Sequence, residues 1–176
     1  MKILIAYASK NGTGSLCVQR LTERMHGKEI TAVNLENGTA DPAPYDIVVL
    51  GGSVYFGKLR PAVRNFMKQY EEVLLQKSLA LFLCCGLDEE HEYYQKKLFP
   101  RVLQERAFCN VFFGGSLHTQ GLSFFDKCIL KSMRSTLFEA DMDNGEYIAN
   151  LPGILPENID KLASYIQMEI IRLCSR

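Results

Sequence analysis

The sequence predicts an α/β protein: a doubly wound sheet of five parallel strands, in the order 2-1-3-4-5, with helices on both faces. Short apolar runs alternate along the chain with segments whose apolar residues recur at the 3.6-residue period of a helix. Polar loops that contain glycine follow the ends of several of these runs. Of the 176 residues, 47% are hydrophobic and 23% are charged, so we expect residues 1–176 to form one globular domain.

The expected strands are segments of five or six residues. The first, third and fourth are almost uninterrupted runs, which is typical of strands covered by helices on both faces. The second mixes polar and apolar residues, which favours a place at an edge of the sheet. The expected strands are Lys2–Tyr7, Glu29–Asn34, Asp46–Leu50, Leu79–Cys84 and Cys109–Phe113.

The segments between the strands carry apolar stripes with helical spacing. Pro61 suits the first turn of the second helix, whereas Pro100 is expected to break or restart the third. The irregular segment Leu137–Pro156 is expected to lead into the last helix. The stripes are Cys17, Leu21 and Met25; Ala62, Val63, Phe66, Met67, Tyr70, Val73 and Leu74; Tyr94, Leu98 and Val102; Phe125, Ile129 and Met133; and Ile159, Leu162, Ala163, Ile166, Ile170 and Leu173.

The charge of the chain is balanced, with 20 basic and 20 acidic residues. This balance gives no reason to expect nucleic acid, and it lacks the excess of carboxylates expected of a dedicated acidic electron carrier. No signal-peptide pattern precedes the first strand, and no apolar run approaches the roughly 18–20 residues needed to span a bilayer. We therefore expect a cytoplasmic protein.

The six cysteines include no CxxC pair and no Cys/His cluster with metal-ligand spacing, so no metal site is predicted. Most lie in apolar patterns and are expected to be core residues, with Cys174 as the exposed thiol. The adjacent Cys84 and Cys85 leave a redox pair open as an alternative. The histidines are expected at the surface, except His118, which follows the fifth strand and could donate a hydrogen bond to a substrate carboxylate.

A polar, glycine-rich loop joins the first strand to the first helix. Small residues let backbone N–H groups converge there, and the start of a helix adds partial positive charge, so the loop suits a phosphate. The simpler interpretation is a polar turn in which Thr13 or Ser15 caps the helix. The expected phosphate-binding residues are Ser9, Lys10, Asn11, Gly12, Thr13 and Gly14.

Other phosphate-binding families fit this loop less well. A dinucleotide-binding fold would have GxGxxG directly after the strand; here the third glycine is missing, although Glu36 stands near the position of a ribose-binding acid. A Walker A loop would end in Gly-Lys-Ser/Thr, which is absent. A phosphoryl-accepting receiver domain would need an aspartate after the third strand, where Gly51 and Gly52 stand.

Two further loops are expected at the same edge of the sheet, where parallel strands end and ligands bind. Gly51–Gly57 combines glycines with two aromatic residues, so its backbone amides and a ring suit a planar ligand. Cys84–Asp88 follows the fourth strand. The simpler interpretation of both is a turn that covers the core. The expected ring-binding residues are Ser53, Val54, Tyr55, Phe56, Gly57, Cys85, Gly86 and Leu87.

Taken together, the three loops resemble those of the flavodoxin-like superfamily, and the resemblance spans the whole chain. Ser9–Gly14 is similar to the family's Ser/Thr-x-Thr-Gly-x-Thr phosphate loop, with Asn11 and Gly14 where the family usually has hydroxyl residues. The resemblance implies FMN as the cofactor. It also implies that the flavin carries the redox chemistry, so that no side chain has to act as a catalyst.

A closer resemblance is to the menaquinone-dependent protoporphyrinogen dehydrogenase branch. Gly51–Gly57 with Ala62–Phe66 is similar to its ring loop and following helix, and Gly114–Leu117 with Phe125–Lys131 is similar to its segment after the fifth strand. The resemblance implies an FMN-dependent oxidoreductase that dehydrogenates protoporphyrinogen or a similar substrate with a quinone-type acceptor. Two alternatives stay open: a flavodoxin-type electron carrier between protein partners, and a flavin-free binding module.

A basic helix is expected to begin near Ser123, where Ser123 and Asp126 resemble a capping box. Lys127, Lys131 and Arg134 then fall on one face of the helix. Our hypothesis is that this face meets an acidic porphyrin, a quinone-bearing membrane surface or an acidic redox partner. The alternative is an ordinary solvated face over the core.

Overall fold

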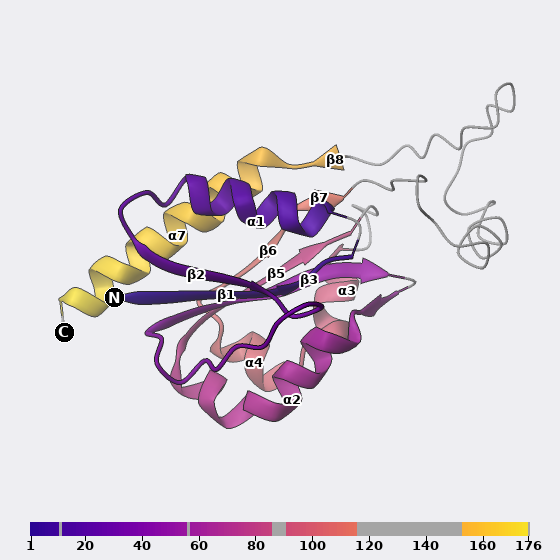
Figure 1. The fold of residues 1–176 in the computed structure, drawn as a ribbon, viewed down its shortest axis with the longest axis horizontal. Helices are drawn as coiled ribbons and strands as arrows, with labels where there is room; N and C mark the ends of the chain where they lie inside the picture. The colour runs from indigo at the N-terminus through magenta and orange to yellow at the C-terminus, as the bar shows by residue number, and fades with distance from the viewer. Residues whose placement is uncertain (11, 56, 86–90, 116–152, 176) are drawn as a thin grey trace, which may run out of the picture.

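Five parallel strands run through the centre of the molecule in the order β2-β1-β3-β5-β6 (Figure 1). This computed structural model describes residues 1–10, 12–55, 57–85, 91–115 and 153–175. The strand order is the predicted one, and the mixed second strand lies at an edge of the sheet as expected. The strands are β1 (Lys2–Ala8), β2 (Glu29–Asn34), β3 (Ile47–Tyr55), β5 (Ser78–Cys84) and β6 (Cys109–Phe112).

Helices cover both faces of the sheet (Figure 1). On one face lie α1 (Thr13–Glu23) and α7 (Pro156–Cys174); on the other lie α2 (Pro61–Gln76), α3 (His91–Leu98) and α4 (Arg101–Arg106). Successive side chains of β1 point into opposite layers of the core: Ile3 and Ile5 pack with α1 and α7, and Leu4 and Ala6 pack with α2. All four side chains are fully buried, which explains the uninterrupted apolar run.

The segment Gly51–Gly57 forms more strand than the sequence analysis expected. β3 continues through the two glycines to Tyr55 and turns back into β4 (Lys58–Leu59), which pairs with it in an antiparallel way. A Cβ atom on Gly51 would lie 2.1 Å from the backbone oxygen of Phe82, so only glycine lets β3 lie this close to β5. The expected loop is therefore the end of a strand and a hairpin.

Pro100 separates α3 from α4, as predicted. The expected stripe through Tyr94, Leu98 and Val102 is wrong at its last member, because the helix restarts at Arg101 and no longer continues the earlier rotation. Val102 is 46% exposed, and Leu103 is fully buried in its place.

The last part of the fold closes on the sheet through a short antiparallel pair. β7 (Gly114–Gly115) pairs with β8 (Gly153–Ile154), which leads directly into α7. The expected helix through Phe125, Ile129 and Met133 and its capping box lie outside the described residues. Within those residues, no helix is both long and apolar enough to cross a bilayer.

Candidate functional site

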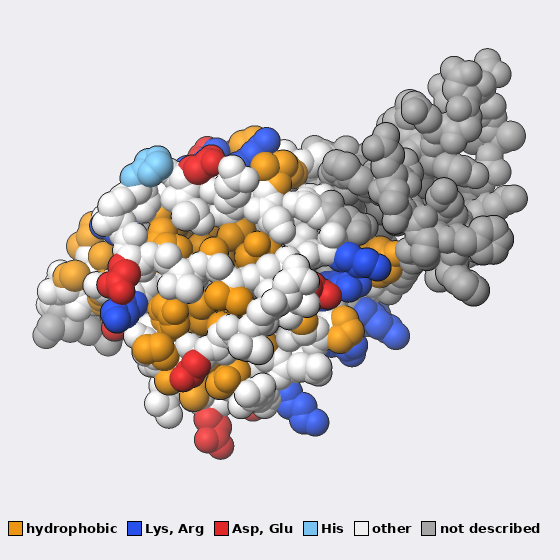
Figure 2. Space-filling model, in the orientation of Figure 1, with side chains coloured by type: hydrophobic (Ala, Val, Ile, Leu, Met, Phe, Trp, Pro, Cys, Tyr) orange, Lys and Arg blue, Asp and Glu red, His pale blue; other side chains and the backbone are white. Residues whose placement is uncertain are grey.

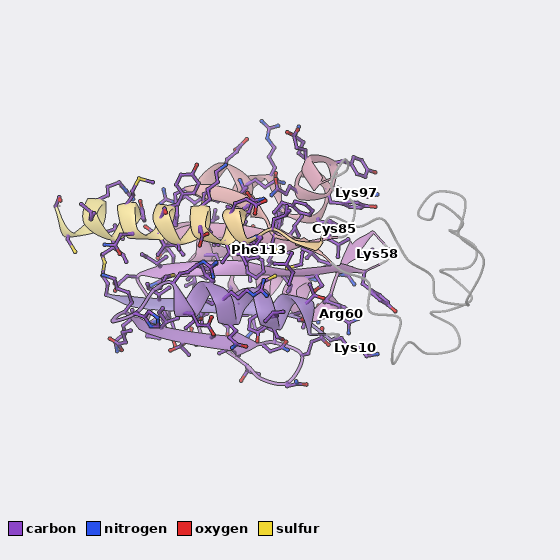
Figure 3. All side chains as sticks on the ribbon, turned by 90° about the horizontal axis from the view of Figure 1, so that it is seen from above. Lys10, Lys58, Arg60, Cys85, Lys97 and Phe113 are labelled. Carbon is purple, nitrogen blue, oxygen red and sulfur yellow. The ribbon has the colours of Figure 1, made fainter. Side chains whose placement is uncertain are left out.

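Three strand ends meet at the carboxyl edge of the sheet. Ala8 of β1 lies beside Gly52 of β3, and Ser53 lies beside Cys84 of β5. The residues that follow these strands therefore start from the same edge, as the sequence predicted (Figure 3).

Gly14 is the point where α1 approaches the first two strand ends most closely. A Cβ atom there would lie 2.9 Å from the Cβ of Ser9 and 3.2 Å from the Oγ of Ser53. Real Cβ atoms do not approach so closely, so a larger residue would push α1 away from both serines. The glycine that departs from the familiar hydroxyl pattern thus brings these two predicted site residues together.

The start of α1 is not capped by a side chain. Its N-cap is Gly12, with φ 87°, and its first turn contains no acidic residue. The interpretation in which Thr13 or Ser15 caps the helix is therefore wrong, because both residues already lie inside the first turn of α1. The positive φ at this position favours glycine. Because glycine has no side chain to cap the helix, the positive end of the helix dipole faces the loop.

The hydroxyl of Ser9 is buried without a hydrogen-bond partner. Ser9 is 5% exposed, and its Oγ is the buried side-chain polar atom in the described chain that lacks a partner. Buried polar atoms are satisfied in the great majority of cases, and an unsatisfied one calls for an explanation. Because this atom lies beside Gly14 at the start of α1, it is placed to donate to a bound anion.

Asn34 holds the backbone of this loop, a role that the sequence analysis missed. The Asn34 amide donates to the carbonyl oxygen of Ser9 at 2.9 Å, and its Oδ1 accepts from the Ser9 N–H at 3.3 Å. The same Oδ1 accepts from the Glu36 N–H at 3.1 Å. The available signal was an asparagine at the very end of an edge strand.

A second missed feature is the ion pair between Arg60 and Glu36. Arg60 donates from Nε and Nη2 to the two Glu36 oxygens at 2.8 and 3.0 Å, and its guanidinium lies 5.8 Å from the centre of the Tyr55 ring. The hydrogen bonds from Arg60 lower the pKa of Glu36, burial partly opposes this effect, and Lys10 adds to the lowering. Glu36 therefore anchors Arg60 beside the hairpin.

The hairpin of β3 and β4 also meets α3. Gly57 has φ 68°, and a Cβ atom there would lie 3.6 Å from the Tyr94 ring. Tyr94 thus borders the hairpin that contains Tyr55, and of these two tyrosines the sequence analysis had named only Tyr55 for the site. Tyr94 was assigned to the core stripe of the third helix.

The adjacent cysteines of the third loop lie in opposite layers of the core. Cys84 belongs to the layer under α1 and α7, and Cys85 belongs to the layer under α2. The hydrogen bond between Cys84 and Cys17, together with burial, raises the pKa of the Cys84 thiol well above its ordinary value. Both thiols are buried, which confirms the core interpretation over a redox pair of neighbours. Cys174 is exposed as predicted.

The structure brings together Ser9, Gly12, Thr13, Gly14 and Ser53 at the first two strand ends, with the hairpin beside them. The described residues contain no group of three His, Cys, Asp or Glu side chains that could hold a metal ion. Eight of the predicted site residues lie outside the described part of the chain: Asn11, Phe56, Gly86, Leu87, His118, Lys127, Lys131 and Arg134.

Comparisons with known proteins found a matching family model and several similar structures. A family model described as a flavodoxin domain matches residues 4–142. A Fusobacterium nucleatum flavodoxin bound to flavin mononucleotide has a similar structure, with a TM-score of 0.58 and 18% sequence identity over 96% of this chain and 98% of that chain. A Streptococcus pneumoniae TIGR4 flavodoxin has a TM-score of 0.54 and 13% identity over 96% of this chain and 99% of that chain.

A larger protein shares the same fold in part. The rubredoxin oxygen:oxidoreductase of Desulfovibrio gigas has a TM-score of 0.50 and 16% identity, and the match covers 77% of this chain and 34% of that one. No curated protein matches the sequence.

Proposed function

The chain belongs to the flavodoxin domain family, and from this premise we propose that it binds FMN and passes electrons between other redox molecules. FMN agrees with the family, and its phosphate suits the loop between β1 and α1. Bound FMN supplies the redox chemistry through its isoalloxazine ring. The protein contributes position, electrostatics and access.

The observation that carries this proposal is the unpartnered Ser9 hydroxyl beside the uncapped start of α1. A phosphate placed there would accept from the Ser9 hydroxyl and from backbone N–H groups of the first turn, and the helix dipole favours its negative charge. Because Gly14 has no side chain, the Ser53 hydroxyl can also lie close to this position. Without an anion, the buried Ser9 hydroxyl has no hydrogen-bond acceptor in the described structure.

The residues of the hairpin are proposed to hold the ring of the cofactor. Tyr55 follows Ser53 and Val54 along β3, with Gly57 in the turn, and Arg60 steadies the Tyr55 ring from one side. Cys85 directly follows β5, and its N–H donates to the Gly114 carbonyl at 3.0 Å. Aromatic and backbone groups of this kind fix a planar ligand and exclude water from its faces.

The experiment that tests the proposal is a comparison of FMN with riboflavin. The purified apoprotein is titrated with each, and the quenching of flavin fluorescence gives the two dissociation constants. If the loop binds phosphate, FMN binds at least about tenfold tighter than riboflavin, because riboflavin lacks only the phosphate. A protein that stays colourless and binds neither flavin would instead be the flavin-free module.

A second candidate is an enzyme that dehydrogenates protoporphyrinogen, or a similar substrate, with a quinone-type acceptor. The observation that favours it is a set of cations around the strand ends, among them Lys10 and Lys58, which suit a substrate that carries carboxylates. Turnover of the FMN-loaded protein with a porphyrinogen and a quinone, measured against reduction of a ferredoxin-type partner, separates this enzyme from an electron carrier.

A further inference from the structure

Four cationic side chains surround the edge where we place the flavin. Lys10 follows β1, Lys58 lies in β4, Arg60 precedes α2 and Lys97 lies in α3. Figure 3 shows all four at the carboxyl end of the sheet, beside Cys85. We call these four residues the basic rim. The space-filling view shows Lys and Arg side chains gathered at this end of the molecule (Figure 2).

Counting only ion pairs between described residues, the charge of the basic rim is partly neutralised. Glu36 pairs with Arg60, and its lowered pKa keeps it ionised near neutral pH, so it offsets one of the four charges. Lys97 has a neutral partner: its Nζ donates to the Tyr93 hydroxyl at 2.9 Å and lies 5.0 Å from the centre of that ring. Among the described residues, Lys58 forms no ion pair.

The basic rim is connected directly to the residues proposed to hold the ring. Lys58 pairs with Tyr55 across the hairpin, and the Arg60 guanidinium lies 5.8 Å from the centre of the Tyr55 ring. Lys97 lies one helical turn after Tyr94, whose ring borders the Gly57 turn. A molecule that approaches the ring end of the site along this side therefore meets the cations before it meets the cofactor.

We propose that the basic rim is the docking surface for a redox protein whose own electron-transfer site is surrounded by acidic side chains. The proposal rests on the FMN function above, because electrons can pass only where the partner reaches the flavin. Opposite charges around two redox sites speed encounter and turn the sites toward one another. Carboxylates are the groups that lysine and arginine side chains pair with at such a surface.

A membrane is the less suitable partner for this surface. Peripheral proteins usually add inserted apolar side chains to their cations. The exposed apolar side chain that the basic rim contacts is Tyr93, which is 55% exposed, and the ammonium group of Lys97 lies over its ring. The exposed groups of the basic rim therefore suit ion pairs with an acidic protein surface better than insertion into a bilayer.

The test uses the FMN-loaded full chain and a matched pair of double variants. Lys58→Glu/Lys97→Glu reverses two rim charges. Lys28→Glu/Lys161→Glu is the control: Lys28 is exposed at the amino end of β2, and Lys161 lies over a tyrosine ring as Lys97 does, at 5.9 Å from the Tyr165 ring centre. The unchanged flavin absorbance spectrum of each variant shows that the cofactor site is intact.

The first readout is reoxidation of the photoreduced protein by small oxidants of opposite charge. Two hexacyanoferrate(III) ions accept one electron each as the flavin is reoxidised, and two protons are released; tris(phenanthroline)cobalt(III) is the cationic counterpart. At low ionic strength we expect the rim variant to lose about tenfold in rate with the anion and to gain in rate with the cation, whereas the control changes neither by more than about twofold. High salt should remove the difference.

The second readout is direct binding of an acidic [2Fe–2S] ferredoxin and of vesicles that contain phosphatidylglycerol. We expect the ferredoxin to bind the wild type and the control, and to bind the rim variant at least about tenfold more weakly at low salt. Equal behaviour of both variants in both readouts would overturn the proposal while FMN binding stands. Rim-dependent binding to vesicles without rim-dependent binding to ferredoxin would overturn it in favour of a membrane. Failure to bind FMN would instead overturn the proposed function itself.

Discussion

At the scale of single residues, Ser9 connects the stability of the fold to ligand binding. Its hydroxyl is buried beside Gly14 and makes no hydrogen bond in the described structure. A buried hydroxyl without a partner costs free energy, and the same hydroxyl contributes when an anion accepts its hydrogen bond. If the proposed phosphate site is correct, we therefore expect Ser9 to favour the FMN-loaded protein over the empty one.

This reasoning gives the first prediction, for Ser9→Ala. The substitution should weaken FMN binding by about 1–2 kcal/mol, roughly 5- to 30-fold, because one hydrogen bond to a charged group is lost. The free energy of unfolding of the apoprotein should stay equal or rise, because the orphaned hydroxyl is gone. Fluorescence titration and urea unfolding measure the two quantities. Ser164→Ala, at an exposed serine that donates to Asp160, is the control and should leave FMN affinity unchanged. A large loss of apoprotein stability in Ser9→Ala would contradict the interpretation.

The second prediction concerns the pH dependence of the Glu36–Arg60 pair. The pKa of Glu36 is lower in the folded protein than in the unfolded chain, chiefly because Arg60 donates to the carboxylate. The contribution of the pair is therefore present above the unfolded pKa near 4.5 and is lost as pH falls through the lower folded pKa. Glu36→Gln should cost about 1 kcal/mol at pH 7 and less at pH 3.

Urea unfolding at the two pH values checks this expectation. The control is Glu71→Gln, at an exposed carboxylate of α2, for which the difference from wild type should be small at both pH values. A Glu36→Gln cost that is the same at pH 3 and pH 7 would show that the ion pair is not its cause.

At the scale of the elements, the turn of the hairpin between β3 and β4 contains a glycine with positive φ. Gly57 and Gly27 have similar positive φ values, 68° and 76°, and neither has a neighbour closer than ordinary contact to a built Cβ atom. Gly57 lies in the hairpin beside Tyr94, whereas Gly27 lies in the turn before β2. The two positions thus allow strain and site geometry to be separated.

The third prediction compares Gly57→Ala with Gly27→Ala. Each should lower the free energy of unfolding by about 1 kcal/mol, because alanine resists positive φ. Only Gly57→Ala should also weaken FMN binding, by roughly tenfold or more, because relief of the strain shifts the hairpin and its Tyr55 ring. Thermal unfolding and FMN titration of both variants measure these effects. Equal FMN affinity in the two variants would remove the hairpin from the ring site.

The elements also show which features of this molecule the sequence could predict. The strands and their order follow from local apolar runs and from the alternation with helices, so four of the five strands lie within one residue of their expected bounds, whereas β3 continues five residues further, to Tyr55. The hairpin was not predictable, because glycine-rich sequence resembles a loop and the strand continues only where Phe82 of β5 leaves no room for a side chain at Gly51. Val102 was predicted to be buried, but the helix restarts after Pro100, so Leu103 instead of Val102 faces the core.

At the scale of the whole molecule, the unpredicted parts of the site are contacts between distant segments. Asn34 reaches back 25 residues to Ser9, and Arg60 reaches back 24 residues to Glu36. No local sequence pattern predicts such pairs, because each residue alone resembles an ordinary strand end or a surface charge. The loop that we propose to bind phosphate could be singled out from the sequence, because its glycines and hydroxyls are adjacent in the chain.

The β7–β8 pair has a consequence for the whole chain. Gly115 pairs with Gly153, and the Leu155 N–H donates to the Phe113 carbonyl at 2.9 Å, so the residues on either side of 116–152 are neighbouring points in space. A short Gly/Ser linker can join two such points at a small cost in loop-closure entropy.

Our fourth prediction is therefore that replacing 116–152 by a linker of about four residues leaves the far-UV circular dichroism spectrum of a folded α/β protein and shifts the thermal midpoint by only a few degrees. Loss of the cooperative transition would show that the segment is needed for folding. If the prediction holds, the sheet and its helices fold without the segment that contains His118, Lys127, Lys131 and Arg134. That segment could then change in evolution while the strand ends that form the candidate site stay in place.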